Sequence, residues 1–241
     1  MLYRIIFFIF FPLLKKIIIS SIQGLENLPK NIPFIIAGNH ISQLDPLVII
    51  GILFPIYKKK VHFIANRGTY GPWIAKYITT NLAGCILVNP RNPGNECINI
   101  ALSWLKKGDL VGIFPEAERV PEGTFLRRGK TGVARLAIRS GLPVLPIGII
   151  TTGEPHHKRG GRKFSKPQDI VTDFILKGKK IEIVIGKPIS FKHYSEKSIN
   201  NDLLHSITDQ IMFHVSQLTN IPTTNKAHQF PNDSQSKNQT T

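Results

Sequence analysis

The sequence predicts an α/β fold in which a largely parallel sheet is flanked by helices. Short apolar runs typical of buried strands alternate with longer segments whose apolar residues recur at the helical period. Clusters of Gly, Pro, Asn and Lys separate these segments, as expected of turns and loops. The N-terminal end adds an apolar segment of a different kind, which we expect to lie in a membrane interface.

The predicted strands are short and rich in Ile, Val and Phe, and several of them end at polar residues. They cover residues 17–23, 32–38, 61–66, 85–89, 110–114, 142–150 and 181–185. A run of this length bounded by turn residues is typical of a strand buried in a parallel sheet.

The predicted helices lie between these strands and carry recognisable start and stop signals. Asp45-Pro46 favours a helix start and Gly141 a helix end, since Asp caps, Pro fits the first turn, and Gly accepts the left-handed cap. Residues 45–57, 70–80, 92–107, 132–140 and 199–218 are predicted to be helical.

Charge and cysteine content narrow the class of protein. The chain has 241 residues with a formal net charge of +16, so it favours anionic partners such as phospholipid surfaces, nucleic acid or phosphorylated substrates. Cys85 and Cys97 stand in no CxxC or Cys/His cluster, which argues against a zinc site and a disulfide framework. We therefore expect no metal and a reducing environment.

The two ends of the chain differ from its middle. Ile5 to Leu14 form an apolar run, bounded by Arg4 and Lys15, which is too short to span a bilayer. We interpret residues 1–19 as a membrane-interface segment; a signal peptide, a spanning helix and a part of the soluble core remain alternatives. Residues 219–241 are polar and are predicted to form a disordered tail, which leaves 20–218 as one domain.

His40 and Asp45 form the first candidate catalytic pair, in the pattern His-x4-Asp directly after the predicted strand 32–38. Ligands of open α/β sheets gather at the carboxyl ends of strands. On a regular helix this spacing would put the two side chains about 140° apart, so they meet only if the intervening residues turn. If they meet, Asp45 orients one ring nitrogen and the other can take a proton. The alternative is a loop histidine beside a helix-capping aspartate.

The charges around Asp45 favour the catalytic interpretation. Asp45 is the only acidic residue between Glu26 and Glu96, and Lys and Arg recur through that stretch. A lone carboxylate in a basic surround is expected to stay ionised. The same positive field would attract a phosphorylated acceptor toward His40.

Three further segments follow in a defined order. The first is a block bounded by Gly84 and Arg91. In the second, the strand 110–114 leads into Phe114-Pro115-Glu116-Ala117-Glu118-Arg119. The third is Leu142-Pro143-Val144-Leu145-Pro146. Together with Asn39-His40-x4-Asp45, this set resembles the glycerolipid acyltransferases, in particular the lysophosphatidate (1-acylglycerol-3-phosphate) acyltransferases. The resemblance covers roughly residues 20–190.

The resemblance implies an enzyme and a distribution of roles. It implies that His40 is the general base, that Asp45 orients it, and that Arg91 binds the phosphate of the acceptor. Glu116 and Arg119 would shape the acceptor site, Asn39 would support the histidine loop and border the substrate, and Arg128 is a further candidate for substrate binding. No cofactor is implied, since acyl-CoA or acyl carrier protein serves as the donor substrate.

The chain departs from the family's pattern at the acceptor motif. Ala117 replaces a Gly and Glu118 a Thr, and the spacing from Gly84 to Arg91 is longer by Pro90. A Gly at such a turn serves positive φ or the close approach of a substrate, which Ala resists. The expected acceptor is 1-acylglycerol 3-phosphate; another lyso-lipid or an amine is the alternative.

The resemblance also sets the expected partners and location. We expect a lysophospholipid acceptor and an anionic phospholipid membrane, with the protein peripheral or monotopic on the cytoplasmic face. The rival from another class is a non-catalytic basic protein that binds anionic lipid or nucleic acid. No helix-turn-helix, RNP-like or zinc-finger pattern supports nucleic-acid binding, so no nucleic-acid partner is expected.

Overall fold

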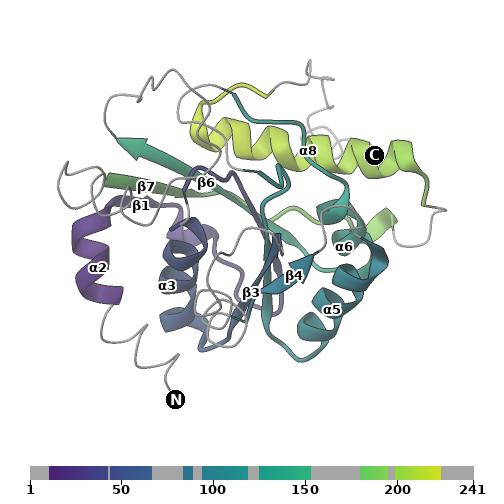
Figure 1. Cartoon of the computed structure of the whole chain (residues 1–241), viewed down its shortest axis with the longest axis horizontal. Coiled ribbons are helices and arrows are strands. Elements are labelled where there is room, and N and C mark those ends of the chain that lie inside the picture. The colour runs from purple at the N-terminus through teal and green to yellow at the C-terminus, as the bar shows by residue number, and fades with distance from the viewer. Residues whose placement is uncertain are drawn as a thin grey trace, which may run out of the picture.

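A computed structural model describes residues 11–42, 44–66, 84–88, 94–118, 125–152, 180–194 and 199–223. In this part of the chain, strands and helices alternate around one sheet (Figure 1). The strands are β1 (Ile19–Gln23), β2 (Ile35–Gly38), β3 (Val61–Asn66), β4 (Ile86–Val88), β5 (Leu110–Ile113), β6 (Val144–Thr152) and β7 (Lys180–Ile185). The helices are α2 (Phe11–Ile18), α3 (Asp45–Tyr57), α5 (Gly94–Lys106), α6 (Gly132–Ser140) and α8 (Asn201–Thr219), with short 3₁₀ turns at Leu25–Asn27 and Lys192–Tyr194.

The seven strands of the described residues pair in the order β1-β7-β6-β2-β5-β3-β4. All neighbouring pairs are parallel except β6 with β7, which is antiparallel. The predicted α/β class with a largely parallel sheet is therefore confirmed. Strand β2 lies between β6 and β5, so the residues that follow β2 and β5 emerge at the same edge of the sheet.

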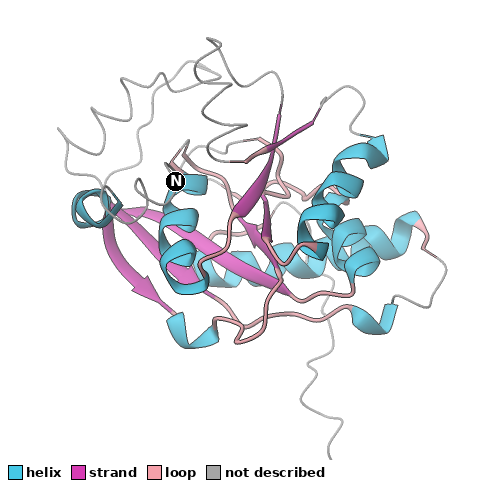
Figure 2. Cartoon of the chain, turned by 90° about the horizontal axis from the view of Figure 1, so that it is seen from below, coloured by secondary structure: helices cyan, strands magenta, loops and turns pink. Residues whose placement is uncertain are grey.

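Helices cover both faces of the sheet, as the view from below shows (Figure 2). One apolar cluster joins α2 and α3 to one face, and a second joins α5, α6 and α8 to the other. Strand β2 alternates between them, because Ile36 belongs to the first cluster and Ile35 and Ala37 to the second. The sheet is thus buried on both sides, which explains why the strands read as continuous apolar runs.

Most predicted elements are present, and their ends differ for local reasons. Helix α6 has the predicted bounds, because Gly141 takes the left-handed conformation (φ 66°) and its N–H donates to the carbonyl of Ala137. The predicted first strand starts too early, since Ile17 and Ile18 end helix α2. The predicted helix 70–80 and the proposed start of α5 at 92–93 lie outside the described residues.

The N-terminal segment is partly described. Within α2, Phe11 and Ile18 are buried, and the Phe11 ring occupies the space where a side chain on Gly51 of α3 would lie. Lys15, Lys16 and Ile17 are exposed. Residues 1–10 lie outside the described residues, so the membrane-interface role of 1–19 stays a prediction. Among the described helices, none has the length and apolarity needed to cross a bilayer.

Folded structure continues past the predicted start of the tail at Thr219. Thr219 ends α8, and beyond it the N–H of Leu126 donates to the carbonyl of Pro222, at 2.9 Å. The described chain stops at Thr223, so the disorder predicted for the remaining residues is not tested.

Candidate active site

The loop between β2 and α3 brings His40 and Asp45 together. The Nδ1 atom of His40 lies 2.7 Å from Oδ2 of Asp45. That same oxygen accepts the backbone N–H groups of Ile41 and Ser42, each at 2.8 Å. The loop therefore turns around the carboxylate, which supplies the bend that the sequence spacing required.

Asp45 does not act as a helix cap. It is the first residue of α3, the capping position is Leu44, and no side chain caps the helix start. Its carboxylate is fully buried and points back into the loop. The alternative of a capping aspartate beside an unrelated histidine is thus not what the structure shows.

The arrangement fixes which ring nitrogen of His40 is available. A carboxylate can only accept, so Nδ1 carries the hydrogen and Nε2 has a free lone pair. No described residue forms a hydrogen bond with Nε2. The ring stacks on Phe114, with centroids 4.3 Å apart and planes inclined by 9°, and the His40 side chain remains 20% exposed. His40 is therefore held on one edge and one face, while its basic nitrogen stays accessible.

Asn39 anchors the loop to the neighbouring strand. Its Nδ2 donates to the carbonyl of Ile149 at 2.8 Å, and its Oδ1 accepts the N–H of Ile149 at 2.7 Å. The side-chain amide thus continues the ladder between β2 and β6 one residue past Gly38. Asn39 is fully buried, so this geometry gives it the expected support of the loop and no contact surface for a substrate.

Glu116 joins the histidine loop to a third segment. Its Oε1 accepts the backbone N–H of His40 at 3.0 Å, and its Oε2 accepts the N–H of Arg127 at 2.9 Å. Burial raises the pKa of Glu116, against the opposing effect of these hydrogen bonds and of the nearby positive groups. The sequence suggested a role in shaping the acceptor site; the structure shows a carboxylate that fastens two loops together.

Ala117 and Glu118 follow Glu116 at the mouth of a pocket. Ala117 has φ 60°, in the left-handed region where Gly is favoured. Ala117 thus adopts the left-handed conformation for which a Gly at this position of the family's motif would be suited. Glu118 is exposed, and its Oε2 lies 2.6 Å from Nη1 of Arg127, so its charge is compensated within the same loop.

Replacing Ala117 by Gly is expected to stabilise the protein by about 1 kcal/mol, because it removes the Cβ that disfavours left-handed backbone. Chemical denaturation of the two proteins measures the difference. Ala134, inside α6, gives the opposite control: Ala134→Gly is expected to destabilise by about 1 kcal/mol or more. A lower stability for Ala117→Gly would contradict the assigned strain.

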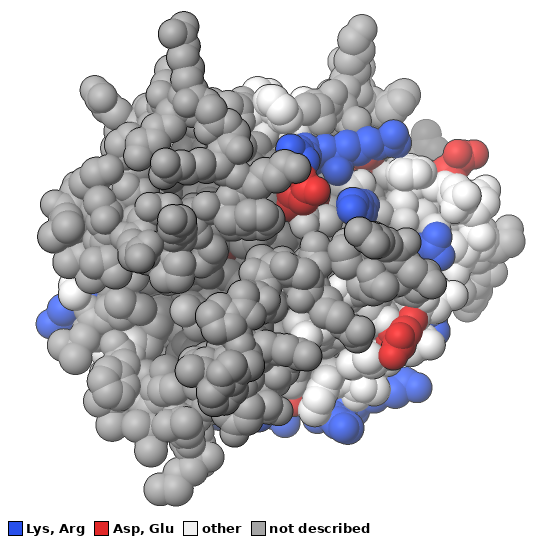
Figure 3. All heavy atoms as spheres, viewed as in Figure 1, with Lys and Arg blue, Asp and Glu red and all other residues white. Residues whose placement is uncertain are grey.

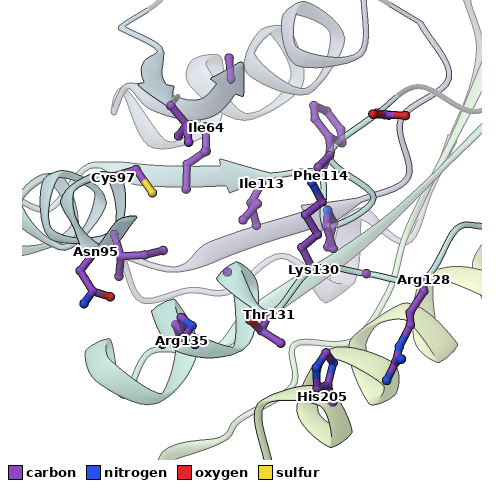
Figure 4. Close-up of a pocket in the computed structure, with 18 residues that line it drawn as sticks. Ile64, Asn95, Cys97, Ile113, Phe114, Arg128, Lys130, Thr131, Arg135 and His205 are labelled. Atoms are coloured by element: carbon purple, nitrogen blue, oxygen red, sulfur yellow. The ribbon is translucent and has the colours of Figure 1, made fainter. Parts of the chain in front are cut away.

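The pocket beside the catalytic loop has a volume of about 750 Å³ and two unlike walls (Figure 4). Apolar side chains from β3, β4, α5 and β5 form one wall, with Ile64, Val88, Ile98 and Ile113 among them. The opposite wall, from the segment before α6, from α6 and from α8, is polar and carries Arg128, Lys130, Arg135 and His205. Phe114 lines the pocket and stacks on His40, so pocket and dyad share this ring.

A second histidine–aspartate pair lies at the other end of the strands. The Nε2 of His62 is 3.2 Å from Oδ2 of Asp109, and its Nδ1 is 2.8 Å from the carbonyl oxygen of Gly84. The ring is buried and stacks on Trp104. Both ring nitrogens of His62 are occupied, so this pair holds structure together, whereas His40 keeps one nitrogen open.

Of the three arginines that the sequence proposes for the substrate site, the structure describes one. Arg128 lines the pocket, and its role in substrate binding stays a prediction; Arg91 and Arg119 lie outside the described residues. Sequence reasoning missed Phe114, although it belongs to the quoted motif, and missed Arg135 and His205, which no motif marks. Among the described residues, no group of three His, Cys, Asp or Glu side chains is arranged to hold a metal ion.

Replacing Glu116 by Gln is expected to lower the free energy of unfolding by about 1–3 kcal/mol. The side-chain amide of Gln has one acceptor oxygen in place of two. Its NH₂ group would therefore face the backbone N–H of either His40 or Arg127, donor against donor. We also expect kcat to fall by about 10- to 100-fold, because the loop that holds His40 loses its support. Denaturation and steady-state kinetics of the purified variant measure both effects.

Glu118→Gln is the matched control for stability, since Glu118 is exposed and is expected to matter by less than about 1 kcal/mol. Equal stability of the two variants would contradict the fastening role of Glu116. The native chain binds the Glu116 proton more readily than the unfolded chain does. The advantage of wild type over Glu116→Gln should therefore shrink as pH rises above about 4.3.

The described geometry defines a class of protein: an α/β enzyme with a buried carboxylate, an oriented histidine and an open basic nitrogen at the carboxyl ends of parallel strands. The chain belongs to the Acyltransferase family, whose sequence model matches residues 20–150. The expected family and the enzyme class, an acyltransferase, are thereby confirmed.

The relatives in this family carry one recurring name. A 1-acyl-sn-glycerol-3-phosphate acyltransferase of Bacillus subtilis is 26% identical over 215 residues, which cover 85% of this chain and 93% of the relative. One of Pseudomonas aeruginosa is 31% identical, over 60% of this chain and 54% of the relative. The chain spans about half the length of several other relatives, such as 45% of one from Brassica napus.

A solved structure has the same fold. The 1-acyl-sn-glycerophosphate (LPA) acyltransferase PlsC of Thermotoga maritima matches with a TM-score of 0.53 and 22% identity, over 82% of this chain and 70% of that chain. This likeness supports the α/β fold with its mostly parallel sheet.

Proposed function

We propose that this protein transfers a fatty acyl group from an acyl thioester to the free hydroxyl of a lysophospholipid, with 1-acylglycerol 3-phosphate as the acceptor, in phospholipid biosynthesis. The observation that carries the proposal is the open Nε2 of His40, whose Nδ1 is held by the buried Asp45. In a chain of the Acyltransferase family, such a histidine has the geometry of a general base.

In the proposed mechanism, Nε2 of His40 removes the proton of the acceptor hydroxyl as that oxygen attacks the thioester carbonyl. Asp45 stabilises the imidazolium that forms. When the tetrahedral intermediate collapses, the carbon–sulfur bond breaks and His40 returns the proton to the leaving thiolate. The products are the acylated phospholipid and the free thiol of the donor.

A serine nucleophile is the alternative route, and Ser42 is the nearest candidate in sequence. Its backbone N–H donates to Asp45, and its Oγ accepts the N–H of Leu44 at 3.2 Å. Among the described residues, no hydrogen bond joins the Ser42 hydroxyl to the ring of His40, as activation of this nucleophile would require. Direct transfer is therefore the mechanism that we propose.

The acceptor proposal draws on the names of the relatives and on the positive charge of the chain. Arg91 and Arg119 are proposed to bind the phosphate of the acceptor. The pairing of Glu118 with Arg127 supports this assignment, because it compensates the negative charge of Glu118 beside the pocket. Ala117, which replaces a family Gly, keeps another lyso-lipid or an amine as the second candidate.

Membrane association at the cytoplasmic face is part of the proposal. Helix α2 exposes Lys15, Lys16 and Ile17, and the neighbouring α3 exposes Leu47 and Ile56. Basic and apolar side chains together suit an anionic phospholipid surface. Figure 3 shows further Lys and Arg side chains spread over the described part of one face.

An assay of purified protein with a labelled acyl thioester and a panel of acceptors tests the function. The panel contains 1-acylglycerol 3-phosphate, glycerol 3-phosphate, a lyso-lipid with a zwitterionic head group, and a long-chain amine. The highest kcat/KM is expected for 1-acylglycerol 3-phosphate. Preference for the zwitterionic lyso-lipid or the amine would replace the acceptor but keep the reaction, and transfer to none of them would refute the function.

A further inference from the structure

The segment 125–130 lies between the catalytic loop and the C-terminal part of the chain. On one side, the N–H of Arg127 donates to Oε2 of Glu116, at 2.9 Å. On the other side, the N–H of Leu126 donates to the carbonyl of Pro222, which follows α8, also at 2.9 Å. Two adjacent residues thus fasten the backbone of this segment to two parts of the protein that are distant in sequence.

Apolar packing holds the same segment against α8. The side chain of Leu126 is 2% exposed and forms a cluster with Met212 and Val215 of α8. Ile221, just beyond the helix, packs against this cluster. The helix and the residues after it therefore hold both the backbone and the side chain of Leu126.

Gly129 marks the closest approach of the segment to α8. A Cβ added at Gly129 would lie 2.6 Å from Cγ2 of Thr208 and 2.9 Å from Cγ of Met212, both in α8. These distances are well inside van der Waals contact, so the position admits no side chain without a displacement. Figure 4 shows Arg128, the preceding residue, extending toward the helix that carries His205, which is α8.

Helix α8 is itself fixed to the sheet. Leu204, Ile207 and Ile211 are buried in the apolar cluster that joins α5, α6 and α8 to one face of the sheet. A close-packed core resists displacement of such a helix. Crowding between α8 and the segment 125–130 is therefore expected to move the segment and not the helix.

We propose that α8 and residues 219–223 position the catalytic histidine through Glu116. They hold the backbone of residues 125–130, this backbone orients the carboxylate of Glu116, and Oε1 of that carboxylate holds the N–H of His40 at 3.0 Å. A displacement at Gly129 thus reaches the histidine loop without any contact to the ring. The proposal rests on the proposed acyl transfer and adds positioning residues to it.

Gly129→Ala tests the proposal, because the added methyl group pushes the segment away from Thr208. We expect kcat to fall about tenfold, and the amide hydrogen of His40 to exchange with solvent about tenfold faster as its bond to Glu116 loosens. Thr208→Ser removes the Cγ2 atom that the new methyl group meets and keeps the hydroxyl that donates to the carbonyl of Leu204. Adding it to Gly129→Ala should restore most of both losses, with Thr208→Ser alone as the reference.

Gly51→Ala is the matched control for crowding between helices. Its added Cβ would meet the ring of Phe11, so it crowds α3 against α2, which belong to the other apolar cluster. It is expected to lower the melting temperature while kcat and the exchange rate at His40 stay within about twofold of wild type.

The route through Glu116 is tested by a double-mutant cycle. In a Glu116→Gln background, Gly129→Ala is expected to lower kcat by less than about twofold, because the link is already broken. The same tenfold loss in both backgrounds would overturn the proposal and would favour another route, such as the bond from the N–H of Lys130 to the carbonyl of Pro115. Unchanged exchange at His40 in Gly129→Ala would overturn it as well.

Ile221→Ala is the second variant, to be used if melting shows that Gly129→Ala is not folded. It shortens a half-buried side chain that packs on the Leu126 cluster, so it loosens the segment without pushing it. We expect kcat to fall about threefold and exchange at His40 to quicken, whereas Ile189→Ala, also half-buried but in the cluster of α5, α6 and α8, leaves both unchanged. Equal behaviour of the two variants would overturn the proposal. Hydrogen exchange needs no turnover, so a wild type without acyl transfer is seen separately from a segment that does not position His40.

Discussion

Replacing His40 by alanine is expected to lower kcat/KM for acyl transfer by about 10⁴-fold or more, with the fold retained. The substitution removes the only group in the described site that has an open basic nitrogen held by a carboxylate. The loop keeps its other supports, because Glu116 binds the backbone N–H of residue 40 and Asp45 binds those of Ile41 and Ser42. Transfer of a labelled acyl group by the purified variant measures the loss.

His193→Ala is the matched control, since His193 is exposed in a 3₁₀ turn and has no part in the site. It is expected to match wild type in activity and in thermal stability. Near-normal transfer by His40→Ala would refute the mechanism. Loss of activity together with loss of the folded state would leave catalysis undecided, so the melting temperature is measured on the same samples; the backbone contacts of the loop predict that it changes little.

Replacing Asp45 by asparagine is expected to lower kcat/KM by about 10²- to 10⁴-fold, less than the loss of His40. This variant tests the negative charge of Asp45, because an asparagine can keep the hydrogen bonds that hold the loop. All three hydrogen bonds of the carboxylate go to Oδ2, while Oδ1 is buried and has no partner among the described residues. An asparagine can place its oxygen at the Oδ2 position and its NH₂ at the Oδ1 position, and so keep the turn.

What Asp45→Asn loses is the negative charge that stabilises the imidazolium. Asp202→Asn, at the exposed start of α8, is the matched control and is expected to leave kcat/KM unchanged. The double variant His40→Ala/Asp45→Asn is expected to be no slower than His40→Ala alone, because the two residues act as a unit. An Asp45→Asn enzyme within tenfold of wild type would show that the carboxylate does not assist the histidine.

The parts of the fold that the sequence predicted well are those with local signals. Asp45-Pro46 marks the start of α3 and Gly141 the end of α6, because capping and left-handed backbone depend on neighbouring residues only. The first strand is predicted too early because Ile17-Ile18-Ile19 is an apolar run that suits a strand as well as the end of a helix. In the structure Ile17 is exposed, and Ile18 packs in the cluster that includes α3 and β7, which lie farther along the chain.

In the site, too, local patterns are predictable from the sequence and contacts between distant segments are not. His40 and Asp45 were found because their pattern is short and local. The bonds of Asn39 to Ile149 and of Glu116 to His40 and Arg127 cross between segments that are distant in sequence. Residue types alone assigned Asn39 and Glu116 to the substrate, and only their partners show that both atoms of each side chain are used on backbone. Likewise, no sequence pattern distinguishes the open ring of His40 from the closed ring of His62.

The two hydrogen bonds that Glu116 accepts, from the backbone of His40 and of Arg127, have a consequence for exchanging loops between family members. Because one carboxylate holds the backbone of both the histidine loop and the segment at Arg127, these stretches adjust to each other as a single unit. A graft of the Gly-Thr version of the acceptor motif at residues 117–118 leaves both bonds in place, because Glu116 and its two backbone partners are not exchanged. A graft of residues 39–45 or of 125–130 replaces one of these partners, so it has to keep a backbone N–H within reach of Glu116.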